Sequence, residues 1–306
     1  MRLGSDHVRV RVPATSANLG PGFDAMGLAL GQFDEVEVRA LGSAEVRVEV
    51  TGEGAGELPT GEDHLVVRAI RAALDDVGAP QVGLHLVCHN TIPHGRGLGS
   101  SAAAVVAGIL AARMLIGEPE ALHNTAAFRI ASAFEGHPDN AAPAILGGGT
   151  ISWTGQDGPH ATQLALHPDV EPVVLVPTTR LATKTARGVL PATVPHADAA
   201  FTAGRAALLV QALCQRPELL LEATEEKLHQ GYRSGVMPAT WRLVQALREA
   251  GQAAVVSGAG PSVLVLERAS DGDAGDRTRE RVLAGLPDTW TVLHPGFADG
   301  ALAERL

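Results

Sequence analysis

The sequence is poor in aromatic residues and cysteines, and it has no long hydrophobic run. Phe, Trp and Tyr make up 3% of the 306 residues, and the two cysteines are Cys88 and Cys214. Two cysteines are too few for a disulfide framework, which fits a reducing, cytoplasmic setting. The longest apolar run covers residues 102–112, and the first twenty residues lack the apolar block of a signal peptide. We therefore expect neither a secreted nor a membrane-spanning protein.

The charge balance is acidic. The chain has 24 Lys and Arg residues against 34 Asp and Glu residues, which gives a formal net charge of −10. Such a surface repels the phosphates of nucleic acids and anionic lipids, so we expect no nucleic-acid partner and no membrane partner. Hydrophobic residues make up 45% and charged residues 19% of the sequence, as in folded globular proteins.

Length and element order indicate two α+β domains. A chain of 306 residues is about twice the size of a common domain. The turn-rich stretch 155–159 offers a boundary. The prediction is therefore one domain over residues 1–158 and a second over residues 159–306.

Hydrophobic periodicity predicts the individual elements. Alternating valines indicate a strand at 8–12 that ends at Pro13, and a hairpin or meander at 36–50 that turns at Gly42 and Ser43. Apolar residues at helical spacing, or in a continuous run, predict helices at 64–77, 101–116, 121–134, 199–214, 217–229 and 239–250. Further strands are expected at 84–88, 173–176, 253–257, 263–266 and, as the final one, 290–294. By composition, residues 155–158 and 272–276 are surface loops.

Glycines alternate in the segment 93–101, Pro-His-Gly-Arg-Gly-Leu-Gly-Ser-Ser, between a predicted strand and a predicted helix. Ser100 stands where a Rossmann turn needs glycine, and Gly99 stands where a Walker loop needs lysine. Without Cβ atoms, the backbone amides of this loop can converge on an anion in front of a helix, which favours a polyphosphate. The hydroxyls of Ser100 and Ser101 can cap the helix and also offer an oxygen to a phosphate-bound Mg²⁺. The alternative is a tight turn with a serine cap.

Two polar segments are candidates for substrate and metal binding. Asn18 and Asp24, after the first strand, could hold an amino or hydroxyl group, or could simply form turns. Glu135 is a candidate Mg²⁺ ligand, and Asp139 could orient or deprotonate a hydroxyl. The spacing of His137 and Asp139 also occurs in transition-metal sites and in plain polar loops.

Arginines and a second glycine-rich turn complete the candidates. Arg187 and Arg233 each lie in polar surroundings, where a fork of two guanidinium groups would suit a carboxylate and a lone arginine would be a surface charge. The turn at 257–262, Ser-Gly-Ala-Gly-Pro-Ser, either approaches the active site or closes a hairpin.

These motifs together resemble homoserine kinases, a family of the GHMP kinase superfamily. The resemblance rests on PATSANLGPGFDAMG, PHGRGLGSSAAA, EGHPDNAAPAILGG, TKTARGVLP and SGAGPSV, in this order and spacing over most of the chain. It implies ATP, Mg²⁺ and L-homoserine as reactants, O-phospho-L-homoserine and ADP as products, a place in threonine biosynthesis, and a homodimer. It also implies a two-domain α+β fold, with a ribosomal-protein-S5-domain-2-like N-terminal domain that binds ATP and a ferredoxin-like C-terminal domain that completes the substrate site.

The resemblance also implies a role for each matching residue. Ser100 and Glu135 would hold Mg²⁺, and Asn18 and Asp24 would bind the amino and hydroxyl end of the substrate. The triphosphate would be wrapped by Pro93, Gly95, Arg96, Gly97, Leu98, Gly99, Ser100 and Ser101. The substrate-side loop would contribute His137, Asp139 and Asn140, with Asp139 as the candidate base, and the substrate carboxylate would pair with Arg187 and Arg233.

Three positions depart from the family pattern. His94 stands where an apolar residue is expected, His64 where an asparagine near the adenine is expected, and Gly231 where a proline is expected. The alternative functions are a catalytically silent nucleotide- or metabolite-binding member of the same fold and a related mevalonate or shikimate type of kinase.

Overall fold

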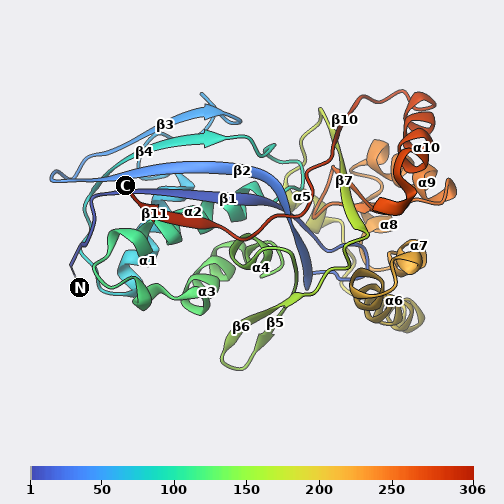
Figure 1. The fold of residues 1–306 in the computed structure, drawn as a ribbon, viewed down its shortest axis with the longest axis horizontal. Helices are drawn as coiled ribbons and strands as arrows, with labels where there is room; N and C mark the ends of the chain where they lie inside the picture. The colour runs from blue at the N-terminus through green and yellow to red at the C-terminus, as the bar shows by residue number, and fades with distance from the viewer. Residues whose placement is uncertain (1) are drawn as a thin grey trace.

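The computed structural model describes residues 2–306, which form two sheets with helices packed on them (Figure 1). The first sheet has seven strands, five of which follow the order β11-β1-β2-β4-β3. Their bounds are β1 His7–Ala17, β2 Met26–Leu41, β3 Val46–Gly52, β4 Gly83–Asn90 and β11 Leu302–Arg305. A hairpin of β5 (Gly149–Gly155) and β6 (Gly158–Leu164) joins the sheet through β2 and projects away from it in Figure 1.

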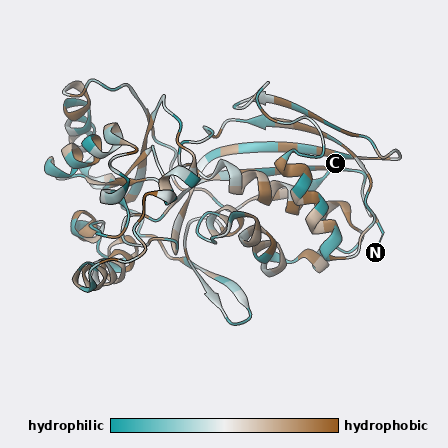
Figure 2. Cartoon of the chain, turned by 180° about the vertical axis from the view of Figure 1, so that it is seen from behind, coloured by the Kyte–Doolittle hydropathy of each residue, from teal (hydrophilic) through white to brown (hydrophobic). Residues whose placement is uncertain are grey.

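Helices cover one face of the first sheet. They are α1 Leu65–Asp76, α2 Ser100–Leu115, α3 Asn124–Glu135 and α4 Ala141–Leu146, with a short 3₁₀ turn at Pro119–Leu122. Helix α2 contacts α1, α3 and strand β1, and most of its side chains are buried. Its Ala-rich, apolar sequence matches this position, because a helix surrounded by neighbours has no polar face to keep in water. Figure 2 shows hydrophobic stretches along these helices.

The second sheet is antiparallel, with the strand order β10-β7-β9-β8. Its strands are β7 Val170–Pro177, β8 Ala253–Val256, β9 Val263–Arg268 and β10 Trp290–Leu293. The larger helices are α6 His196–Cys214, α9 Pro238–Glu249 and α10 Gly272–Ala284. The shorter elements are α5 Thr183–Gly188, α7 Leu220–Ala223 and α8 Gln230–Arg233, with 3₁₀ turns at Pro217–Leu219 and Ala269–Asp271. This order of strands and helices is the ferredoxin-like arrangement that the resemblance implies.

Strand pairing differs from the prediction at 36–50. Strand β3 does not form a hairpin with β2; it pairs in parallel with β4, while β2 pairs antiparallel with β4. The parallel register requires the crossover through α1, which the local turn at Gly42 and Ser43 does not reveal. The predicted hairpin at 253–266 is confirmed by the antiparallel pair β8 and β9.

Several element boundaries also differ. Strand β1 continues through Pro13 to Ala17, with a register shift after Pro13. The predicted loop at 272–276 is the first part of α10, and the predicted helix at 217–229 is broken into a 3₁₀ turn, α7 and a loop before α8. The strand at 290–294 is followed by another, β11, which pairs with β1.

The chain passes from the first sheet to the second after the β5–β6 hairpin. Residue 158, the predicted domain limit, is the first residue of β6, and β5 and β6 both belong to the first sheet. The second sheet starts at Val170, and the C-terminal segment returns to the first sheet as β11. Within residues 2–306, no helix has the length and apolar character needed to cross a bilayer.

Candidate active site

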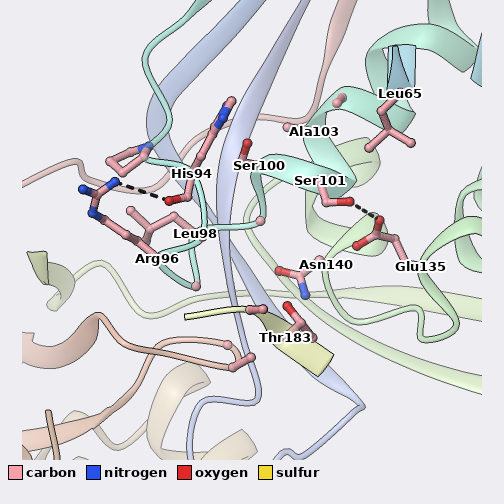
Figure 3. Close-up of a pocket in the computed structure, with 18 of the residues that line it drawn as sticks. Leu65, His94, Arg96, Leu98, Ser100, Ser101, Ala103, Glu135, Asn140 and Thr183 are labelled. Carbon is pink, nitrogen blue, oxygen red and sulfur yellow. Dashed lines mark hydrogen bonds between the residues drawn. The ribbon is translucent and has the colours of Figure 1, made fainter. Parts of the chain in front are cut away.

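A cavity of about 600 Å³ is lined by both halves of the chain (Figure 3). The first half contributes the glycine loop, the start of α2 and the segment that follows α3, while the second half contributes α5, α8 and the β8–β9 turn. The predicted site residues that line it are Asn18, Pro93, Gly95, Arg96, Gly97, Leu98, Gly99, Ser100, Ser101, Glu135, His137, Asp139, Asn140, Arg187 and Arg233. Asp24, the remaining candidate, reaches this group through Arg187.

The glycine loop has the left-handed backbone that its sequence favours. Gly95, Gly97 and Gly99 have φ angles of 65°, 70° and 69°. A Cβ atom on Gly97 would collide with the backbone oxygen of Ser257, and one on Gly99 with the hydroxyl of Thr15. Glycine is therefore required here both for the backbone conformation and for close contact with neighbouring segments. The loop opens the N-terminus of α2 toward the cavity, which is the arrangement that binds phosphate groups.

The side chain of Arg96 fixes the loop to the second sheet. Its Nε donates to the carbonyl of Pro177 at 2.9 Å, and its terminal nitrogens donate to the carbonyls of Thr178 at 3.1 Å and His94 at 3.3 Å. The guanidinium group is thus occupied by backbone oxygens at the end of β7. Through these bonds Arg96 connects the glycine loop to the end of β7.

The two serines after the loop have different positions. Gly99 is the residue before α2, and among the described residues no side chain caps this helix, so the predicted serine cap is wrong. The Ser101 hydroxyl donates to Oε1 of Glu135 at 2.6 Å (Figure 3). Ser101 therefore orients the Glu135 carboxylate, while Ser100 lines the cavity at the first position of the helix.

A hydrogen-bond network surrounds Asp139. Asp139 is 1% exposed, and its Oδ1 accepts from Nδ1 of His137 at 2.7 Å and from Nδ2 of Asn140 at 3.3 Å. The bond to Asp139 raises the pKa of His137. Asn140 is fixed in turn by the Thr15 hydroxyl, which donates to its Oδ1 at 2.9 Å. Both donors act on Oδ1 of Asp139, and neither of these bonds uses Oδ2.

Asp24 and Arg187 form a two-point ion pair across the domains. The terminal nitrogens of Arg187 lie 2.6 and 3.1 Å from the carboxylate oxygens of Asp24, and this pairing raises the pKa of Arg187. Both side chains are about one-third exposed. Asn18 shapes the loop that holds Asp24, because its Oδ1 accepts from the Asp24 amide at 2.9 Å and its Nδ2 donates to the carbonyl of Gly258 at 2.7 Å. Asn18, at φ 71°, is thus a turn former as well as a cavity residue.

Arg187 and Arg233 both have their guanidinium groups near the ring of Phe23. The guanidinium carbons lie 5.6 Å (Arg233) and 5.8 Å (Arg187) from the centre of the Phe23 ring. Arg233 is 1% exposed, and burial, followed by the positive charge of Arg187, lowers its pKa to about 10. Both guanidinium groups therefore lie beside the same ring, and both arginines line the cavity that also contains Asp139.

The turn at 257–262 lies against the glycine loop. The Ser257 hydroxyl donates to the carbonyl of Gly97 at 2.7 Å and accepts from the hydroxyl of Ser16. The Gly258 amide donates to the carbonyl of Ala17 at 3.0 Å. Of the two alternatives for this turn, the approach to the site holds, and the same turn also closes the β8–β9 hairpin.

Comparison with known proteins identifies the family. Residues 64–148 match the family described as GHMP kinases N terminal domain. The homoserine kinase of Clavibacter michiganensis is 52% identical over 94% of this chain and 90% of its own length, and that of Streptomyces coelicolor is 53% identical over 91% and 88%. The chain belongs to the homoserine kinase family. A crystal structure of homoserine kinase from Cytophaga hutchinsonii is similar to it with a TM-score of 0.85 and 26% identity, covering 98% of both chains.

Sequence reasoning missed several residues of this homoserine kinase site. Thr15, Phe23 and His229 escaped notice because their contacts join segments far apart in the sequence. Thr183, at the start of α5, lines the cavity, and Figure 3 shows it pointing toward the same space as Asn140. Asp34 also lines the cavity, and here a signal existed, because it shares the inward face of β2 with Val36 and Val38.

Asp34 anchors the start of the glycine loop. Its Oδ1 accepts from the amides of Thr91 at 2.7 Å and Ile92 at 2.9 Å, just before Pro93. Burial raises the pKa of this carboxyl to about 6. The unfolded chain ionises an aspartate near pH 4, so ionising Asp34 favours unfolding, and the stability present below pH 4 is lost as the pH rises through 6.

We expect Asp34→Asn to stabilise the fold in a pH-dependent way. The amide keeps the acceptor oxygen and removes the buried charge, so the free energy of unfolding at pH 7.5 should rise by about 1 to 3 kcal/mol. The gain should shrink as the pH falls through 6 and disappear below pH 4, where the wild-type carboxyl becomes protonated in both states. Denaturant unfolding at several pH values measures this, with the exposed Asp273→Asn as control. A loss of stability at pH 7.5, or a gain that does not change with pH, would contradict the assignment.

Proposed function

We propose that this protein transfers the terminal phosphoryl group of ATP to the side-chain hydroxyl of L-homoserine, giving O-phospho-L-homoserine and ADP for threonine biosynthesis. The observation that carries the proposal is the identity above 50% to homoserine kinases over most of the chain. The cavity supports the proposal. Its lining includes a glycine loop of the kind that binds phosphate and, in another part, Asp139 and the two arginines. Phosphoryl transfer depends mainly on alignment and charge stabilisation, and such a cavity supplies both.

The ATP end of the proposal rests on the glycine loop. Its three glycines adopt left-handed backbone conformations, which fits a loop whose amides converge on the triphosphate. His64 and His94 line the cavity on the side of Leu58 and Pro59, where the nucleoside would extend, and burial lowers the pKa of both histidines. These rings are therefore neutral near pH 7.

The donor set also fits Mg²⁺. A carboxylate and a hydroxyl, those of Glu135 and Ser100, are hard oxygen ligands of the kind that this ion takes beside phosphate oxygens and water. When bound, Mg²⁺ neutralises phosphate charge during transfer. Ser101 would keep the Glu135 carboxylate in the orientation needed to receive the ion.

We expect Glu135→Gln to raise the Mg²⁺ requirement. The neutral amide is a poorer ligand, so the Mg²⁺ concentration that gives half-maximal turnover should increase on the order of 10-fold or more. Thermal unfolding without nucleotide should change little, because Glu135 is partly exposed. The exposed Glu249→Gln is the matched control. An unchanged Mg²⁺ dependence in Glu135→Gln would rule out the ligand role.

The substrate end rests on charge complementarity. Homoserine carries an ammonium and a carboxylate, and the site offers the Asp24 carboxylate and the guanidinium groups of Arg187 and Arg233. Asn18 holds the Asp24 loop, and the substrate hydroxyl would meet the group formed by His137, Asp139 and Asn140. In this arrangement Asp139 orients the hydroxyl and is available to accept its proton.

An ADP-release assay tests the function. Purified protein with ATP and Mg²⁺ should turn over L-homoserine far faster than mevalonate, galactose or shikimate. Faster turnover of one of the other three compounds would mean that the protein is a kinase with a different substrate. ATP binding without transfer to any of these alcohols would favour a catalytically silent member. The homodimer and the cytoplasmic location stay predictions, which sedimentation and cell fractionation would test.

A further inference from the structure

His229 is a fully buried histidine that no step of the proposed reaction uses. It directly precedes α8, the short helix that ends at Arg233, and its exposed fraction is 0%. The Phe23 ring stacks on it, with ring centres 4.8 Å apart and planes at 19°. The carboxylate of Glu226 holds the segment by accepting from the backbone amides of Leu228, His229 and Gln230. A polar ring that is buried this completely needs a partner for each nitrogen.

The two partners determine which nitrogen carries the proton. Nε2 lies 2.8 Å from the carbonyl oxygen of Gly20, which can only accept, so Nε2 carries a hydrogen and donates. Nδ1 lies 3.1 Å from a terminal nitrogen of Arg233, which can only donate, so Nδ1 presents its lone pair. One neutral tautomer satisfies both bonds. Burial lowers the pKa of His229 and favours the same uncharged ring.

The bond to Arg233 orients the guanidinium group. Nε of Arg233 donates to the carbonyl of Ala186 at 3.2 Å, and the nitrogen that donates to His229 also lies 3.3 Å from the carbonyl of Gly258. These bonds use Nε and Nη1, so Nη2 is the nitrogen that they do not engage. Since Arg233 lines the cavity, its remaining donor is available to a ligand carboxylate.

We propose that His229 is a positioning residue, which directs Arg233 at the substrate carboxylate through the lone pair of its Nδ1. The inference rests on the proposed function, because it takes an amino-acid carboxylate as the ligand of Arg233. The other bond of His229, to Gly20, lies at the start of the 18–24 loop that carries Asp24. One imidazole thus connects the carboxylate-binding arginine with the loop that would bind the ammonium group.

Two substitutions separate the two bonds. The side-chain oxygen of His229→Asn lies near the place of Nδ1 and keeps an acceptor for Arg233. The side-chain amide nitrogen of His229→Gln extends toward the place of Nε2 and keeps a donor for Gly20. We expect the Gln variant to raise KM for L-homoserine on the order of 10-fold, with KM for ATP unchanged, because Arg233 loses its acceptor. The Asn variant should stay within a few-fold of the wild type.

The Arg233→Ala background supplies the second measurement. If His229 acts through Arg233, adding His229→Gln to Arg233→Ala should change KM for L-homoserine less than twofold. Equal effects of Asn and Gln, a larger effect of Asn, or a full additional effect on the Arg233→Ala background would overturn the proposal. Thermal unfolding shows whether each variant folds. If one of the two His229 variants fails to fold, the other is measured alone and on the Arg233→Ala background, and that comparison decides. A wild-type protein inactive on L-homoserine would instead refute the proposed function.

Discussion

Gly97→Ala is expected to lose ATP binding and to destabilise the fold. The added methyl group would collide with the backbone oxygen of Ser257 and would lie 2.9 Å from that of Gly260, while the backbone stays at a φ of 70°. Both neighbours are backbone atoms of the β8–β9 turn, so they cannot rotate away as a side chain could. The loop must therefore move, and a shift of about 1 Å in a catalytic element costs on the order of 100-fold in rate.

The measurements for Gly97→Ala are KM for ATP, kcat/KM and the free energy of unfolding. We expect kcat/KM for ATP to fall about 100-fold or more and the free energy of unfolding to fall by about 2 to 5 kcal/mol, from backbone strain and overpacking together. Gly251→Ala is the matched control, because Gly251 has a φ of 85° and no described atom within 4 Å of an added Cβ. That variant should lose about 1 kcal/mol of stability and keep its kinetics. Unchanged ATP kinetics in Gly97→Ala would show that the loop does not bind the phosphates of ATP.

Local patterns predicted those parts of the fold that local physics determines. Helix α1 follows from apolar residues three and four positions apart, and the β8–β9 hairpin from two apolar runs around a glycine turn. Helix α10 was missed because its sequence is polar and contains glycine and aspartate. It packs on the second domain with Arg279 buried and bonded to Glu267 of β9 at 2.7 Å, a tertiary contact that composition does not show.

The same distinction between local patterns and long-range contacts applies to the site. The glycine loop and the serines were found because all their chemistry lies within nine consecutive residues. The two arginines were found only as candidates, since their shared position beside Phe23 depends on how α5 and α8 pack against the 18–24 loop. His229 gave no signal, because the bond that gives it meaning reaches Gly20, 209 residues earlier. A pairing of that range is a property of the fold and not of any local segment.

Arg187→Ala is expected to weaken homoserine binding without affecting ATP. Arg187 and Asp24 neutralise each other through bonds of 2.6 and 3.1 Å. A zwitterionic amino acid can replace both halves of this pair at once, since its ammonium suits Asp24 and its carboxylate suits Arg187. This exchange conserves the number of charged contacts, so homoserine can open the Arg187–Asp24 pair at little cost in free energy. A ligand with only one charge would leave one member of the pair without a partner, which costs more.

The loss of one charged hydrogen bond corresponds to an increase in KM for L-homoserine of about 10- to 100-fold. The matched control is Arg242→Ala, which removes an arginine from an exposed ion pair with Asp288 and should leave the kinetics unchanged. A substrate without the carboxylate sharpens the test, because 3-aminopropan-1-ol keeps the ammonium and the hydroxyl. The wild type should strongly prefer homoserine over this amino alcohol, and Arg187→Ala should lose most of that preference. If the variant kept the full preference, the carboxylate would be bound elsewhere, and Arg187 would serve only to hold the Asp24 loop.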